Sequence, residues 1–343
     1  MPFWVIYPIV GSFLISLVLS DHLRLLGSRL GFLDEPKKDR KKHKGGVSTL
    51  GGAAIYIAFT VVVLGVLVWN DHFTSGEITH LHFVGFLLGG LVLIIGGLFD
   101  DKYDLPPKLS IIFPVIAALL AAGFGIGVAK ITNPLGGFFE ISSVVSFIVT
   151  IIWLVGVMYT TKLLDGLDGL AGGVSAIGML MIAFLALTTA FYQPDVALLA
   201  IIGAVAVLGF LVWNVHPASL FLGEGGSTLI GYILGVMAVI AGSKIATALL
   251  VVAVPLFDII FVLWDRKRSG KSLFSGDRRH LHHRLRDAGW SVHQVVWFYY
   301  AIALAFGLTT LVFESWQKLV ALAVLLMLTF GIIRFSSKGI CTT

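Results

Sequence analysis

The chain has 343 residues, of which 57% are hydrophobic and only 13% are charged. Soluble domains carry about 25% charged residues, so this composition excludes a water-soluble globular protein and is typical of a polytopic membrane protein. The net charge is +5, and the single cysteine, Cys341, can form no internal disulfide.

Eleven apolar runs are long enough to cross a bilayer, which takes about 20 residues of helix. We therefore predict an all-α polytopic membrane protein with about eleven transmembrane helices. The first run has no basic n-region and no small-residue cleavage site, which predicts a retained helix. No repeat or linker divides the chain, so residues 1–343 are expected to form a single integral membrane domain. In chain order the runs are 2–20, 47–69, 81–99, 110–128, 143–160, 170–191, 196–213, 227–242, 245–264, 293–313 and 318–335.

The basic residues predict the orientation of these helices. With the N-terminus outside, the inner segments hold all of the 24 lysines and arginines except Lys130, Lys244 and Lys318. The positive-inside rule then places the C-terminus in the cytoplasm. The run "KKDRKKHK" is interpreted as an anionic-lipid contact and topology signal, so no nucleic-acid partner is expected.

The same orientation places most acidic and histidine-rich motifs on the inner side. If these loops converge, they form a site for a polyanionic substrate, with or without a divalent metal. The motifs are "LFDDKYDLPPKLS" with Asp100, Asp101 and Asp104, "LLDGLDGLAGG" with Asp165 and Asp168, "FLGEGGSTLIGY" with Glu224, and "SGDRRHLHHRL" with Asp277, His280, His282 and His283.

Each motif has a structural interpretation beside the functional one. A single Asp at a helix start is usually an N-cap, but Asp100 and Asp101 end a long apolar run, where carboxylates are costly and functional by default. Asp165 and Asp168 either close a glycine-rich turn or bind ring donors or a cation. "GEGGS" is a weak candidate for a phosphate nest. "DRRHLHHRLR" fits a solvated loop, a zinc site or a phosphate-binding segment, and the neighbouring arginines favour phosphate.

Together, in this order, the motifs resemble the polyprenyl-phosphate N-acetylhexosamine-1-phosphate transferases. The resemblance runs from about residue 34 to residue 290 and rests on "RKKHKGGVSTLGG", "GGLFDDKYDLPPKL", "LLDGLDGLAGG", "NVHPASLFLGEGGSTLIGY", "VPLFD" and "DRRHLHHRLRDAG". The phospho-MurNAc-pentapeptide transferases are related but fit less well. The family's enzymes begin lipid-linked O-antigen, enterobacterial common antigen or teichoic acid linkage synthesis.

The resemblance implies transfer of a sugar-1-phosphate, with GlcNAc-1-phosphate as the expected group, from a UDP-sugar to undecaprenyl phosphate, with release of UMP. It implies catalytic roles for Asp100, Asp101 and Asp168, with Asp101 orienting the acceptor through Lys108 in preference to acting as a base. It places Asp165 near the nucleotide and the metal, and Glu224 at a metal-ligand position. The remaining substrate-binding residues that it implies are His43, Lys44, Asn214, Arg278, Arg279, His280, His282 and His283.

This chain departs from the family at three positions. Lys162 stands where relatives usually have Asn, Glu224 where they have Asp, and Ser219 where they often have Lys. The resemblance implies Mg²⁺, yet a protonated lysine has no acceptor with which to ligate a metal. We therefore predict that Lys162 forms an ion pair with Glu224 and is also held by Asp165, with the ammonium in the place of the ion.

Two other functions remain open. A catalytically degenerate relative would bind polyprenyl phosphate without turnover, and a cation-coupled transporter would need acids near the midplane, for which Asp258 is the main candidate. The expected partners are a UDP-sugar, undecaprenyl phosphate and the bilayer, and glycine-rich faces permit a homodimer. The expected location is a bacterial-type plasma membrane, with the site facing the cytoplasm.

Overall fold

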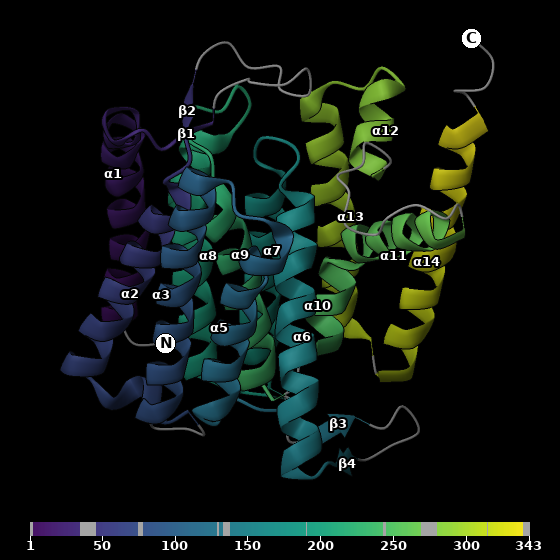
Figure 1. The fold of residues 1–343 in the computed structure, drawn as a ribbon. Coiled ribbons are helices and arrows are strands. Elements are labelled where there is room, and N and C mark those ends of the chain that lie inside the picture. The colour runs from purple at the N-terminus through teal and green to yellow at the C-terminus, as the bar shows by residue number, and fades with distance from the viewer. Residues whose placement is uncertain are drawn as a thin grey trace.

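The computed structural model describes residues 3–34, 46–74, 78–128, 130–132, 138–189, 191–242, 245–268, 280–313 and 315–338. Within these ranges the chain is mostly helical (Figure 1). The helices are η1 (Phe3–Val5), α1 (Ile6–Leu30), α2 (Gly51–Trp69), η2 (Asp71–Thr74), α3 (His80–Tyr103), α4 (Pro107–Ser110), α5 (Ile112–Gly123), α6 (Ser143–Leu164), α7 (Leu170–Leu187), α8 (Pro194–Asn214), α9 (Gly223–Ile240), α10 (Ile245–Val251), α11 (Ala253–Arg268), α12 (Leu281–Asp287), α13 (Val292–Val312) and α14 (Ser315–Lys338).

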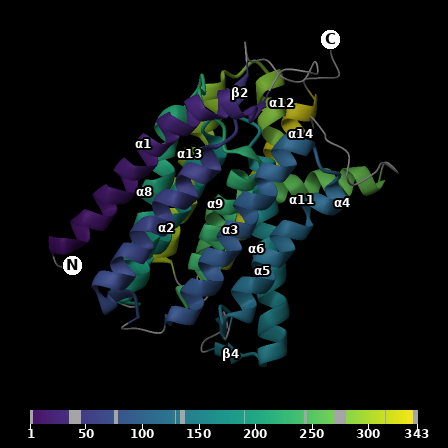
Figure 2. The same ribbon diagram turned by 60° about the vertical axis from the view of Figure 1, so that its left-hand side comes forward.

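Two short antiparallel hairpins accompany the helices. β1 (Leu33–Asp34) pairs with β2 (Val47–Ser48), and β3 (Lys130–Thr132) pairs with β4 (Phe138–Glu140). The β1–β2 hairpin and α12 lie at one end of the helix bundle, and β3–β4 lies at the other (Figures 1 and 2). The hairpins therefore mark the two ends of the bundle.

Eight helices of the described chain are long and apolar enough to cross a membrane. These are α2, α3, α6, α7, α8, α9, α13 and the continuous segment of η1 and α1, which counts as one helix. Length and composition thus confirm a multi-pass helical membrane protein.

Of the other three predicted runs, two form shorter or broken helices and one lies within a single helix. Run 110–128 becomes α4 followed by α5, which ends at Gly123 before a glycine-rich stretch in which Gly125 has a positive φ. Run 245–264 is broken into α10 and α11, and α11 lies across the bundle (Figure 1). Pro255 lacks an amide hydrogen and is tolerated only in the first turn of a helix, so the chain cannot continue α10 through it. Run 318–335 lies within α14.

Small polar side chains join α1 to α8. Ser12, Ser16 and Ser20 are spaced by four residues, lie on one face of α1 and are buried. Ser12 and Ser16 donate hydrogen bonds to the carbonyls of Ile202 and Ala206, at 3.0 and 2.6 Å. Without a strong hydrophobic force between helices in lipid, such close packing and hydrogen bonding hold the helices together.

Glycines bring the start of α9 between α2 and α3. Gly97 of α3 lies against the backbone of Gly225, and Gly52 of α2 lies against that of Gly226. A Cβ atom at any of these positions would overlap the facing backbone. The "GEGGS" glycines therefore permit the helix contact that places Glu224 beside the end of α3.

Candidate functional site

The loops that were expected to converge do so at the β1–β2 end of the bundle. The segment before α2 pairs with the segment before α9, where the amides of Gly51 and Gly52 donate to the carbonyls of Phe221 and Leu222. The buried Asn214 joins two further loops. Its Oδ1 accepts from the Gly169 amide at 3.0 Å, and its Nδ2 donates to a carbonyl of the loop before α9 at 2.8 Å. Asn214 is thus engaged by backbone at both ends of its amide.

Asp100 closes the loop that follows α3. Its Oδ1 accepts from the Leu105 amide at 3.0 Å, and its Oδ2 accepts from Ser110 Oγ at 2.5 Å. These bonds fold the "DLPPKLS" segment back over the end of the helix. Ser110 ends both α4 and the "LFDDKYDLPPKLS" motif, but it was not among the predicted site residues, because an uncharged serine gives no signal of its own beside the aspartates.

Asp101 contacts the first turn of α9. Its Oδ1 accepts from the Glu224 amide at 3.1 Å. The amides of a first helical turn lack partners within the helix and carry partial positive charge, so a carboxylate is stabilised there. Gly223, with φ of 73°, provides the backbone turn beside this carboxylate. The expected route through Lys108 differs, since Lys108 is exposed on α4 and forms no ion pair with a described residue.

The predicted ion pair between Lys162 and Glu224 is present. Lys162 lies in the last turn of α6, and its Nζ is 2.5 Å from Glu224 Oε2. The same Nζ donates to Ser110 Oγ at 3.3 Å. Among the described residues, Lys162 forms no ion pair with Asp165, contrary to expectation. The ammonium instead contacts Glu224 directly and is linked to Asp100 through Ser110.

Asp165 and Asp168 lie in the loop between α6 and α7 and have different surroundings. Burial, followed by repulsion from Glu224, Asp168 and Asp101, raises the pKa of Asp165 well above its usual range. Asp168 instead accepts from the Ala218 amide at 3.1 Å and lies 2.6 Å from His216 Nδ1. Asp168 therefore binds the loop after α8, and His216 joins the site through the "NVHPA" motif.

A buried carboxylate fixes the histidine segment. Asp258 of α11 is only 3% exposed, and its two oxygens contact His280 Nδ1 and the Leu281 amide, each at 2.9 Å. In the sequence, Asp258 stands at the end of the "VPLFD" motif and was assigned no role other than that of a candidate transporter acid. The structure shows that it determines where α12 begins, because it caps the first residues of that helix.

His282 links the histidine segment to the "DGLDG" loop. The side chain is 2% exposed, and its Nε2 has no partner among the described residues and faces Gly166. Burial, and then the neighbouring imidazoles of His283 and His280, lower the pKa of His282 well below its usual value. The ring of His282 lies between those of His280 and His283, with centroid distances of 5.8 and 4.2 Å.

The described donor groups do not fit the magnesium ion that the resemblance implies. No group of three His, Cys, Asp or Glu side chains in the described ranges has the arrangement of a metal site. Glu224, at the implied ligand position, is paired with an ammonium. A protonated lysine has no acceptor with which to ligate a metal, and its positive charge repels a divalent cation from the same oxygen.

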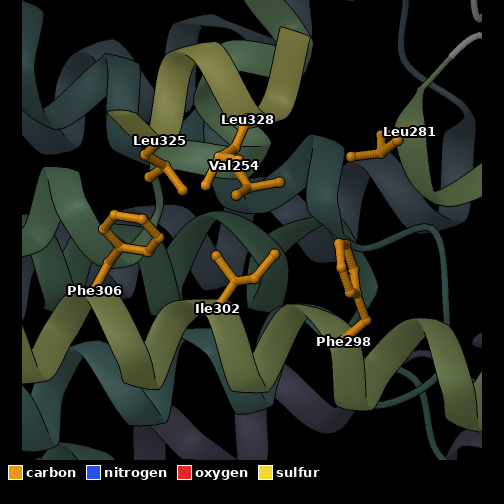
Figure 3. A pocket seen from close by; sticks show the side chains of 7 residues that line it. All are labelled: Val254, Leu281, Phe298, Ile302, Phe306, Leu325 and Leu328. Atoms are coloured by element: carbon orange, nitrogen blue, oxygen red, sulfur yellow. The ribbon is translucent and has the colours of Figure 1, made fainter. Parts of the chain in front are cut away.

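A cavity of about 220 Å³ lies beside the start of α12 and is entirely apolar (Figure 3). It lies between α11, α13 and α14 and is lined by Val254, Leu281, Phe298, Ile302, Phe306, Leu325 and Leu328. With no polar side chain, it offers nothing to a phosphate. A separate small pocket is lined by Asp100, Ser110, Lys162, Glu224 and Thr228 with apolar neighbours, and charged groups gather there.

Four predicted site residues, His43, Lys44, Arg278 and Arg279, lie outside the described residues, as does Asp277. The others fall into two groups at one end of the bundle. One group is Asp100, Asp101, Lys162 and Glu224, and the other is the histidine segment against the "DGLDG" loop. The residues that sequence reasoning missed are Ser110 and His216, together with the positioning role of Asp258.

Fold and site define a class: a multi-pass helical membrane protein whose carboxylates, lysine and histidines gather on loops at one end of the bundle. Comparison with known proteins makes this specific. The family model for glycosyl transferase family 4 matches residues 83–242.

Curated relatives cover most of the chain. A probable undecaprenyl-phosphate N-acetylglucosaminyl 1-phosphate transferase of Bacillus subtilis is 29% identical, over 94% of this chain and 89% of the relative. The decaprenyl-phosphate N-acetylglucosaminephosphotransferase of Mycobacterium tuberculosis is 30% identical, over 85% and 78%. An undecaprenyl-phosphate α-N-acetylglucosaminyl 1-phosphate transferase of Escherichia coli is 25% identical, over 83% and 77%. The chain belongs to glycosyl transferase family 4, which confirms the resemblance found in its motifs.

Proposed function

We propose that the protein transfers GlcNAc-1-phosphate from UDP-GlcNAc to undecaprenyl phosphate and releases UMP, as the first membrane step of a cell-surface glycan. The observation that carries this proposal is the polar cluster at one end of an apolar bundle, in a chain whose relatives are named for this transfer. A lipid acceptor requires a protein embedded in the membrane, and a nucleotide sugar requires a site at its aqueous face.

The reaction is attack of an acceptor phosphate oxygen on the sugar-bearing phosphorus, so catalysis is mostly positioning and charge neutralisation. The second pKa of a phosphate monoester is about 6, and the acceptor is already largely dianionic at neutral pH. Asp101 and Asp100 therefore serve to orient, and their hydrogen bonds to α9 and to the loop after α3 support that role. A general base is not required.

The histidine segment is assigned to the donor. His280, His282 and His283, with Arg278 and Arg279 that precede them, bind the donor phosphates or sugar. Guanidinium groups form bidentate hydrogen bonds with phosphate, and a neutral imidazole such as that of His282 can donate one N–H hydrogen bond. His43 and Lys44, which precede α2 in the sequence, contribute further cationic or polar groups, and Lys108 contributes another from α4. Asn214 and Asp258 act as positioning residues, because their side chains form hydrogen bonds with the backbone of neighbouring segments.

We assign the site to the cytoplasmic face of a bacterial-type plasma membrane. The distribution of lysine and arginine supports an outer N-terminus and a cytoplasmic C-terminus. We propose eleven spans, which requires that α4–α5, α14 and α10–α11, with its change of direction, cross the bilayer in addition to the eight long helices. The whole chain then acts as one integral membrane domain, and its glycine-rich faces permit a homodimer.

A single assay tests the function against its alternatives. Purified protein in detergent is incubated with UDP-GlcNAc and undecaprenyl phosphate, and both UMP and the lipid-linked product are measured. We expect both products in equal amounts. Binding of the lipid phosphate without UMP release would identify a degenerate relative, and ion uptake into proteoliposomes without either product would identify a transporter.

A further inference from the structure

Lys162 is the cation of the small pocket that Asp100, Ser110, Glu224 and Thr228 also line, and its role in the transfer rests on the proposed function. Lys162 Nζ lies 2.5 Å from Glu224 Oε2 and 3.3 Å from Ser110 Oγ, which in turn donates to Asp100. The side chain of Lys162 is 22% exposed, so the ammonium is partly sheltered from water yet accessible from the pocket. Lys162 is therefore a fixed positive charge at the centre of an acidic cluster.

The cluster needs such a charge if it is to bind phosphates. Asp100, Asp101, Glu224 and Asp165 place four carboxyl groups around this end of the bundle. Nucleotide and lipid phosphates add further negative charge, and carboxylates alone would repel them. Some cation has to separate the carboxylates from the phosphates.

A divalent ion and the Lys162 ammonium cannot both occupy this position. Magnesium binds oxygen at about 2.0–2.1 Å and is held by carboxylates together with substrate phosphates. The Glu224 oxygen that would serve as a ligand already contacts the ammonium. The extra methylene of glutamate relative to aspartate lets the carboxylate reach Lys162 from the first turn of α9, and the ammonium takes the place of the metal.

We propose that the protein transfers the sugar phosphate without a divalent metal, and that Lys162 is the catalytic cation. Its ammonium is positioned by the ion pair with Glu224 and the hydrogen bond to Ser110. An oxygen of the lipid phosphate forms a bond to the sugar-bearing phosphorus. The bond from that phosphorus to the bridging oxygen breaks, and its electron pair leaves on UMP. Lys162 keeps its proton and stabilises the negative charge that develops on the leaving phosphate, as charge-assisted hydrogen bonds do.

The first test is turnover of the purified protein in excess EDTA and in millimolar Mg²⁺. We expect the two rates to agree within about twofold, since no step needs the ion. Lys162→Asn should lower turnover by about 100-fold or more, which is the usual effect of removing one charge-stabilising donor. Lys102→Asn is the matched control, because Lys102 lies against Phe32 and Tyr103 at the end of α3, outside the pocket. Turnover that is lost in EDTA and restored by Mg²⁺ would overturn the inference and leave the proposed function intact.

The second test does not depend on turnover. Mn²⁺ binding is followed by electron paramagnetic resonance in the unmodified protein and in the double variant Lys162→Asn with Glu224→Asp. We expect no stoichiometric Mn²⁺ site in the unmodified protein and a new site in the double variant, which should also become EDTA-sensitive. One tightly bound Mn²⁺ in the unmodified protein would refute the inference even if no transfer were seen with any sugar. A lack of transfer with every sugar would contradict the proposed function, whatever the result of the Mn²⁺ measurement.

Discussion

Replacing Gly97 with alanine should separate α3 from α9. A Cβ at Gly97 would overlap the Cα and amide nitrogen of Gly225, and these backbone atoms cannot move without the whole helix. Restoring an ordinary contact requires a displacement on the order of 1 Å in a close-packed interior. Such overpacking typically costs about 1–3 kcal/mol, and the rigid backbone on both sides places Gly97→Ala near the upper value.

The matched control is Gly156→Ala in α6, where a Cβ meets no atom within 4 Å. Both changes gain the same helix propensity, up to about 1 kcal/mol, so the difference between the variants isolates the packing. We expect Gly97→Ala to unfold at a clearly lower temperature than Gly156→Ala in detergent, measured by tryptophan fluorescence.

Turnover should change with the packing. The Asp101 carboxylate accepts from the Glu224 amide at 3.1 Å, and a further 1 Å would break this bond. Misplacement on that scale can cost about 100-fold in rate. Equal melting temperatures and equal UMP release for Gly97→Ala and Gly156→Ala would refute the proposed helix contact.

Three further predictions concern the loops. Asp258→Asn removes one of two acceptors that position α12, so the KM for UDP-GlcNAc should rise by about tenfold, with little change in the KM for the lipid. The control is Asp195→Asn, at the far end of α8. Unchanged donor kinetics in Asp258→Asn would contradict the positioning role. The pKa of His282 is lowered, so the unfolded chain takes up a proton below about pH 6.5 while the folded chain does not, and stability falls as pH falls, by up to about 1.4 kcal/mol per unit. The melting temperature of the unmodified protein should therefore drop relative to His282→Gln between about pH 7.5 and 5.5, and parallel curves would exclude the effect. The pKa of Asp165 is raised, so its contribution to stability is present at low pH and lost as pH rises; Asp165→Asn should melt at the same or a higher temperature at neutral pH while turnover falls, and a large loss of stability would show that the carboxylate is structural.

Hydropathy and motif spacing were sufficient to predict the class of protein. Long apolar runs specify membrane helices, because each helix satisfies its own backbone hydrogen bonds within the run. The chain's membership of glycosyl transferase family 4 was likewise visible in its ordered motifs. The Lys162–Glu224 contact could be predicted because two unusual residues of opposite charge stand at positions that the resemblance brings together.

The other contacts between distant segments were decided by tertiary structure alone. Asp258 and His280 are 22 positions apart, and Asp101 and Glu224 are 123 apart, so no local pattern relates them. The break between α10 and α11 and the short α5 depend on packing as well as on composition, and hydropathy averages over both. The sequence by itself therefore determined that the chain lies in a membrane, to which family it belongs and which polar residues matter. The fold decided which of those residues touch, because the close approach of glycine backbones at α2, α3 and α9 places the carboxylates within reach of one lysine.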